Sequence, residues 1–144
     1  AAQYELGRIY YYGEGVIQDY EEAVKWFNLS ADQGDATAQY ELGLMNELGK
    51  GIIIRDYDEA LKWFNLSADQ GDVDAQYKLG HKYHSGEGVT QDYIQAHKWY
   101  NIAGANGHED SPKGRDAVES RMPPEQVTEA QKLAREWMEK HKKK

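Results

Sequence analysis

The sequence predicts an all-α protein: an α/α solenoid (superhelix) of three helix-turn-helix repeats followed by a two-helix C-terminal cap. Two observations predict this fold class. Within each repeat, apolar residues recur at helical spacing between Asp and Gly residues that mark helix ends. A hexapeptide also returns at offsets of 36 and 37 residues, as Ala2-Gln3-Tyr4-Glu5-Leu6-Gly7, Ala38-Gln39-Tyr40-Glu41-Leu42-Gly43 and Ala75-Gln76-Tyr77-Lys78-Leu79-Gly80. Such a period is typical of stacked helical repeats, each of which buries its apolar face on its neighbours.

The first helix of each repeat contains the hexapeptide, and the small Gly that closes the hexapeptide allows a second helix to approach closely. Glycine-rich loops follow this helix at Gly13-Glu14-Gly15, Gly49-Lys50-Gly51 and Gly86-Glu87-Gly88. A glycine-rich loop can bind phosphate at a helix N-terminus. These loops have no preceding strand and no P-loop Lys-Ser/Thr, so we interpret them as turns.

The second helix of each repeat begins at an Asp N-cap and ends at a Gly. The Asp residues are followed three positions later by Glu or Gln, the capping-box spacing, at Asp19, Asp56 and Asp92. The terminal glycines are Gly34, Gly71 and Gly107. The repeats therefore span 1–34, 35–71 and 72–107, with one inserted residue within 51–56. The first repeat lacks the capping Asp and is N-terminally incomplete, so we expect it to expose Tyr and Leu to solvent or to another copy.

Residues 108–144 predict a C-terminal cap of two helices, about 109–121 and 124–140. Val127, Leu133 and Trp137 are expected to close the last interface of the repeats. Gly114 is expected to weaken the first cap helix by about 1 kcal/mol relative to Ala. Pro123 precedes the second cap helix at the position where a side chain could act as its N-cap, and Pro has no side-chain group that can do so.

Charge and composition exclude several classes of protein. The 144 residues carry 25 acidic and 17 basic side chains, a formal net charge of −8, which argues against nucleic acid as the partner. Residues 1–107 hold 17 of the acidic and 8 of the basic groups. We expect their partner to be a protein or peptide, and this excess of acidic groups favours a basic one. The absence of Cys excludes disulfides, iron–sulfur clusters and thiol nucleophiles. No apolar run is long enough for a membrane span. The compartment stays open between the bacterial cytoplasm and, if a signal peptide was removed, the periplasm or exterior.

The repeated residues resemble the Sel-one-like repeat, a tetratricopeptide-like α/α unit of bacterial type, over residues 1–107. The segment around Pro124-Glu125-Gln126 resembles the C-terminal end of many bacterial members. Asn46 departs from the pattern, because the first and third repeats have Tyr10 and Tyr83 there. The resemblance implies a protein-interaction module or scaffold that binds a partner peptide or protein in a concave groove lined by the first helices.

The resemblance also implies which residues face this groove. They are Tyr4, Arg8, Tyr11 and Tyr12 in the first repeat, Tyr40, Leu44, Glu47 and Leu48 in the second, and Tyr77, His81, His84 and Ser85 in the third. Tyr11 and Tyr12 do not recur and lie beside Arg8, and Tyr and Arg are enriched at binding hot spots. These three residues form either a contact patch or ordinary surface decoration.

Two other functions compete with partner binding. The runner-up is a structural module that stacks or homo-oligomerises with other repeats, in line with self-association through the first repeat. The third is an enzyme, either metal-dependent or penicillin-interacting. His81, His84 and Glu47 could ligate Zn²⁺, but His-x-x-His alone is a weak signal. No Ser-x-x-Lys or Gly-x-Ser-x-Gly motif occurs. The sequence therefore assigns no catalytic residue, no metal ligand and no cofactor.

Overall fold

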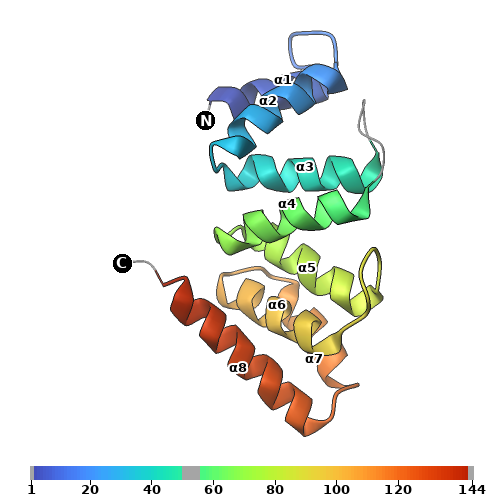
Figure 1. The fold of residues 1–144 in the computed structure, drawn as a ribbon, viewed down its shortest axis with the longest axis vertical. Helices are drawn as coiled ribbons and strands as arrows, with labels where there is room; N and C mark the ends of the chain where they lie inside the picture. The colour runs from blue at the N-terminus through green and yellow to red at the C-terminus, as the bar shows by residue number, and fades with distance from the viewer. Residues whose placement is uncertain (1, 50–55, 143–144) are drawn as a thin grey trace. The chain divides into compact units, whose positions relative to one another are not determined.

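The computed structural model describes residues 2–49 and 56–142, and within these ranges it contains helices and no strand (Figure 1). The prediction of an all-α repeat fold is confirmed. The helices are α1 (Ala2–Tyr12), α2 (Tyr20–Asp32), α3 (Ala36–Leu48), α4 (Tyr57–Asp69), α5 (Val73–Ser85), α6 (Tyr93–Ala105), α7 (Ser111–Glu119) and α8 (Pro124–Lys140). The insertion predicted in the second repeat falls largely on 51–55, outside the described residues.

The chain forms two compact units, residues 1–67 and 68–144, whose boundary falls inside α4. We call them unit 1 and unit 2. Unit 1 contains the first repeat and most of the second. Unit 2 contains the third repeat (α5 and α6) together with the C-terminal helices α7 and α8.

The aspartates predicted as N-caps begin the second helices. The Asp19 carboxylate accepts hydrogen bonds from the backbone N–H groups of Glu21 and Glu22 at 3.0 and 3.2 Å. Asp56 and Asp92 each accept one, from Glu59 and Gln95, at 3.1 Å. Each bond satisfies a helix-start N–H that has no partner within the helix.

A second hydrogen bond ties each of these aspartates back to the first helix of its repeat. The backbone N–H of Asp19, Asp56 and Asp92 donates at 2.9 Å to the carbonyl oxygens of Tyr10, Asn46 and Tyr83. Because this contact uses only backbone atoms, Asn46 supports it as well as the two tyrosines do. The Asn46 amide itself is buried and donates to the Leu42 carbonyl at 2.9 Å.

The glycines after the first helices adopt the backbone conformation that the turns require. Gly49 and Gly86 are the C-caps of α3 and α5, with φ angles of 69° and 77° in the left-handed region. Side chains other than Gly rarely adopt this conformation.

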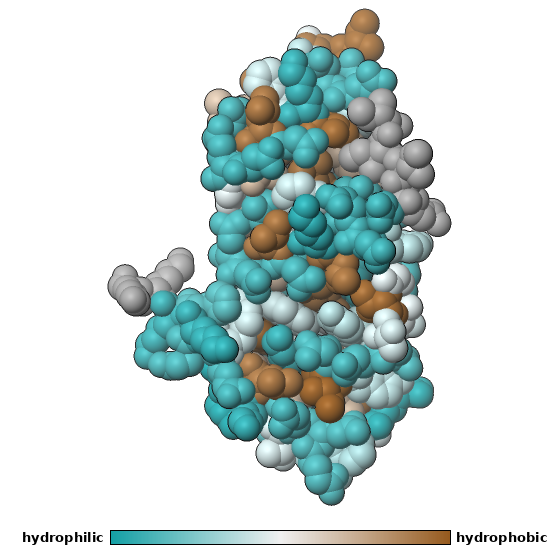
Figure 2. Space-filling model, in the orientation of Figure 1, coloured by the Kyte–Doolittle hydropathy of each residue, from teal (hydrophilic) through white to brown (hydrophobic). Residues whose placement is uncertain are grey.

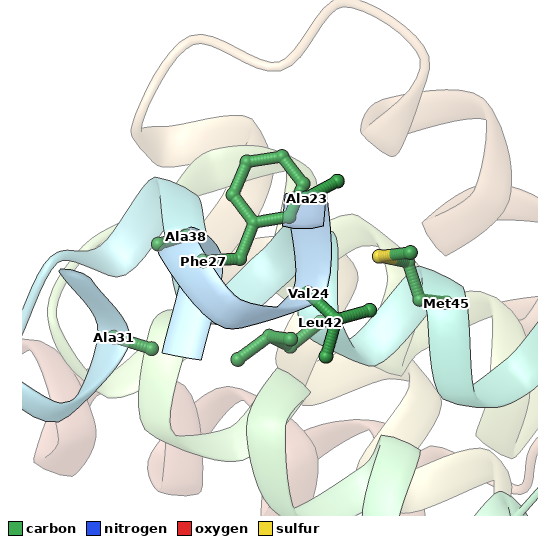
Figure 3. Close-up of a cluster of buried hydrophobic side chains, with 7 residues drawn as sticks. All are labelled: Ala23, Val24, Phe27, Ala31, Ala38, Leu42 and Met45. Carbon is green, nitrogen blue, oxygen red and sulfur yellow. The ribbon is translucent and has the colours of Figure 1, made fainter. Parts of the chain in front are cut away.

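The core of unit 1 lies between α2 and α3. Figure 3 shows the buried side chains contributed by the two helices: Ala23, Val24, Phe27 and Ala31 from α2, and Ala38, Leu42 and Met45 from α3. Helix α1 closes on this cluster through Gly7. A Cβ atom at Gly7 would come within 2.5 Å of the Phe27 ring, so the close approach predicted for this glycine column is confirmed in unit 1.

The core of unit 2 surrounds Tyr100 of α6, which is 2% exposed. Its ring lies between Gly80 of α5 and Gly114 of α7, and a Cβ atom at either glycine would come within 2.7 Å of the ring. Val118 and Met122 complete this cluster with Ala96 and Ala130.

The C-terminal helices pack on the third repeat within unit 2. Val127 lies against the Tyr100 cluster, and the Trp137 ring makes an edge contact with Trp99 at 5.8 Å between centroids. Helix α7 begins at Ser111, two residues later than expected. Helix α8 matches its expected bounds and starts after Pro123 without a side-chain cap.

The face of the molecule drawn in Figure 2 is mostly hydrophilic. Figure 2 shows the hydrophobic residues on the face in view as separate patches among hydrophilic ones. Within the described residues, no helix has the length and apolar character that crossing a bilayer requires.

Candidate functional site

The Tyr column predicted to face the groove packs against the second helices. Tyr4, Tyr40 and Tyr77 are each half-buried, and their ring centroids lie 5.6–5.8 Å from those of Phe27, Phe64 and Tyr100 respectively. Burial, followed by the nearby Glu41 carboxylate, raises the pKa of Tyr4. These tyrosines therefore hold each helix pair together and leave only part of their surface for a partner.

The patch predicted in the first repeat divides into a packed and an exposed part. Tyr11 is half-buried, with its ring centroid 5.2 Å from that of Tyr20. Tyr12 is 59% exposed. The Arg8 guanidinium lies 6.0 Å from the centroid of the Tyr12 ring and 3.3 Å from the Glu5 carboxylate. Tyr12 and Arg8 are thus the members of this patch that a partner could reach.

The second repeat presents a different mixture. Leu44 is half-buried, and Leu48 is 54% exposed at the end of α3. Glu47 is only 7% exposed, which leaves little of its carboxylate for a partner or a ligand. Leu48 is therefore the most accessible of the three.

The four groove positions of the third repeat line one open pocket of about 560 Å³ in unit 2: Tyr77, His81, His84 and Ser85. Tyr93 and Tyr100 of α6 form another wall. The third wall comes from the C-terminal segment, through Asp110, Lys113 and Arg121. The third repeat is therefore the place where the predicted groove residues surround a cavity.

His84 makes a side-chain hydrogen bond inside the pocket. Its Nδ1 lies 3.1 Å from the Tyr100 hydroxyl oxygen. Burial, followed by the charges of His81 and Arg121, lowers the pKa of His84, so the imidazole is neutral at pH 7. Burial, followed by the neighbouring Tyr77, raises the pKa of Tyr100 to about 12, so the phenol keeps its proton.

His108 fixes one side of the pocket from the loop between α6 and α7. Its imidazole stacks on the Tyr77 ring at 4.2 Å between centroids, with 12° between the planes. Its Nδ1 lies 3.1 Å from the Ser111 hydroxyl at the start of α7. The stack thus connects α5 to the segment that contributes Lys113.

The two cations of the pocket have no acidic partner among the described residues. Lys113 and Arg121 are exposed, and no carboxylate of the described residues lies within 4.0 Å of either. Asp110 lines the same pocket without pairing with them. Lys113, Arg121 and Asp110 together give the pocket one net positive charge, in a chain whose formal net charge is −8.

Sequence reasoning missed this third wall. The sequence predicts the C-terminal helices only as a cap, and Gly114 only as a residue that weakens the first of them. One departure from the repeat pattern could have pointed to the pocket. Tyr100 stands where the other repeats have Phe27 and Phe64, and its hydroxyl reaches His84. Within residues 2–49 and 56–142, no three His, Asp or Glu side chains are arranged to hold a metal ion.

Comparisons with known proteins agree on the repeat. The Sel1 repeat family model matches residues 1–35, 36–72 and 73–108. The comparison with the curated proteins finds no match.

Two solved structures are similar to the chain. One is a Sel1 repeat protein from Oxalobacter formigenes, with 37% sequence identity and a TM-score of 0.74, over 81% of this chain and 86% of the other. The second is a protective antigen of uropathogenic Escherichia coli strains that displays an SLR fold. It shares 30% identity with a TM-score of 0.69, and the match covers 96% of this chain but 38% of the antigen.

Proposed function

Because the chain belongs to the Sel1 repeat family, we propose that it is a protein-interaction module that binds a partner peptide or protein along its first helices. Sel1 repeat folds generally mediate protein–protein interaction and are generally non-enzymatic scaffolds. In finer detail, we propose that each unit contributes groove contacts of its own: Arg8, Tyr12 and Leu48 in unit 1, and His81 and His84 in unit 2.

The pocket of the third repeat is the observation that carries this proposal. Four positions that the family pattern assigns to the groove line one cavity there, and a cavity with aromatic walls and a few polar groups is a suitable place for a partner side chain. In unit 1, Tyr12 adds an exposed aromatic ring with the Arg8 guanidinium over it. Tyr and Arg side chains of this kind supply much of the energy of protein interfaces.

The charge distribution indicates the general character of the partner. Residues 1–107 hold 17 acidic and 8 basic groups, so a segment that carries basic residues associates faster at low ionic strength. The runner-up role, self-association through the first repeat, stays a prediction, and sedimentation at several protein concentrations tests it.

Affinity capture with two matched variants tests the groove. The groove variant combines Tyr12→Ala, Arg8→Ala and His81→Ala. The control combines Leu29→Ala, Leu66→Ala and Lys132→Ala, which truncate exposed side chains outside the groove positions.

We expect the wild type and the control to capture the same partner from a native lysate and the groove variant to lose it. Circular dichroism checks that both variants stay folded. If the folded groove variant retains the partner, the groove assignment is wrong.

A further inference from the structure

We propose that the pocket of the third repeat binds one carboxylate side chain, Glu or Asp, of the partner segment, through Lys113, Arg121 and His84, which all line it. The proposal rests on the proposed function and names the chemistry that this part of the groove recognises. The rest of the groove can still contact basic residues, because the pocket differs in charge from the surface of the repeats.

The charges of the pocket select a monoanion. Lys113 and Arg121 supply two positive charges, Asp110 supplies one negative charge, and neither cation pairs with a described carboxylate. One carboxylate therefore balances the net charge of these three side chains. A phosphate dianion would leave an excess negative charge beside Asp110, so the charge balance favours Glu or Asp over a phosphorylated residue.

The hydrogen-bond donors suit the same ligand. An Arg side chain can donate two parallel N–H bonds to a carboxylate. The Tyr100 phenol, which keeps its proton, can donate to Nδ1 of His84, and the neutral imidazole then carries its hydrogen on Nε2. The Nε2–H is then a donor that no described residue engages. The aromatic rings of Tyr77 and Tyr93 line the same open pocket and can pack against the methylene groups of a Glu or Asp side chain.

The acidity of the rest of the chain does not prevent this contact. Exposed charges more than about 8 Å away are largely screened at physiological ionic strength. The local charge of the pocket then decides the affinity, and the acidic surface mainly slows the approach of an acidic segment.

Four fluorescein-labelled peptides test the proposal by polarisation. They share the frame Gly-Ser-X-Ala-X-Ala-X-Gly, with X as Glu, Gln, Lys or phosphoserine. We expect the Glu peptide to bind at least about tenfold tighter than the Gln peptide, as a charge-assisted hydrogen bond contributes. NMR signals of the His81 and His84 imidazoles should shift with the Glu peptide only.

Variants of the two cations identify the site. Arg121→Gln and Lys113→Gln should each weaken the Glu peptide about tenfold. The matched controls Arg135→Gln and Lys132→Gln remove the same charges from exposed positions of α8 and should leave binding unchanged. Arg121→Glu should lose the Glu peptide and gain the Lys peptide.

Equal binding of the Glu and Gln peptides, or no Glu-dependent shift of the histidine signals, overturns the carboxylate proposal. Equal weakening by the α8 controls would mean that net charge alone acts. Tighter binding of the phosphoserine peptide would replace the monoanion site by a phosphate site. Partner capture that is lost in the groove variant, with no preference for Glu over Gln, would leave the proposed function standing and remove only this inference.

Discussion

The substitution Gly114→Ala separates what the sequence predicts from what the structure predicts, because the two differ in sign. Gly114 is in α7, where Ala would be the better helix former. In the structure, a Cβ atom there would lie 2.7 Å from two carbons of the Tyr100 ring. Tyr100 is buried and meets Gly80 on another side at the same distance, so the ring has little freedom to move away.

The magnitude follows from two opposing effects. Replacing Gly by Ala in an unhindered helix lowers the free energy of the folded state by about 1 kcal/mol. Overpacking a full core costs about 1–3 kcal/mol, and a ring held on two sides by backbone places the cost at the upper end. We therefore expect a net loss of about 1–2 kcal/mol in the free energy of unfolding, and a melting temperature lower by about 2–8 °C.

Urea unfolding followed by circular dichroism measures the change. Gly104→Ala in α6 is the matched control, because its Cβ atom would lie 3.7 Å from its nearest neighbours, an ordinary contact. The control should gain up to about 1 kcal/mol. In a Tyr100→Leu background, Gly114→Ala should cost less than in the wild type. If Gly114→Ala stabilises the protein as Gly104→Ala does, the packing argument is refuted.

Three further predictions concern the caps and the buried groups of unit 2. Asp92→Ala should lower the free energy of unfolding by about 1 kcal/mol while Asp92→Asn keeps most of it, and equal losses in urea unfolding would contradict the capping role. Glu119→Ala removes the carboxylate 2.8 Å from Nε2 of the fully buried His97 and should cost about 1–3 kcal/mol, whereas the exposed Glu129→Ala should change little by the same assay. The pKa of Tyr100 is raised from 10.0 to about 12, so the stability that its neutral form contributes is complete below pH 10 and is lost, by about 2–3 kcal/mol, as the pH rises towards 12. Tyrosinate absorbance in the wild type and in Tyr100→Phe checks this, and identical alkaline unfolding of the two proteins would contradict it.

The repeat units were predictable because each depends on contacts that are short in sequence and occur three times. The Asp92 carboxylate meets a backbone N–H three residues away, and the same spacing recurs at Asp19 and Asp56. The glycine of each hexapeptide meets the aromatic residue 20 or 21 positions later, as Gly7 meets Phe27 and Gly80 meets Tyr100. Because the same pair of residues recurs at nearly the same spacing in every repeat, such contacts can be predicted from the sequence alone.

The groove positions were only partly predictable. A position in the family pattern indicates which way a side chain faces, but it does not give the exposed fraction of that side chain. Tyr12 and Tyr11 are neighbours in the same predicted patch, yet Tyr12 is exposed and Tyr11 packs between α1 and α2. Glu47 is buried and Leu48 is exposed, which is the reverse of what the hydrophobicity of the two side chains predicts. How each helical turn packs against the neighbouring helix decides which of its side chains are exposed.

The sequence by itself determined the helix pairs, their caps and the close approach of each first helix to its second, since these rest on local spacing and on a repeated pattern. Only the tertiary structure decided that α7 supplies Lys113 and Gly114 to a pocket of the third repeat, and that Arg121 lies near His84. Lys113 and Arg121 follow His84 by 29 and 37 positions (113 − 84 and 121 − 84), Gly114 follows Tyr100 by 14 (114 − 100), and none of these three belongs to a repeat column. No local spacing encodes such a contact, because it exists only once the C-terminal segment has packed against α5 and α6.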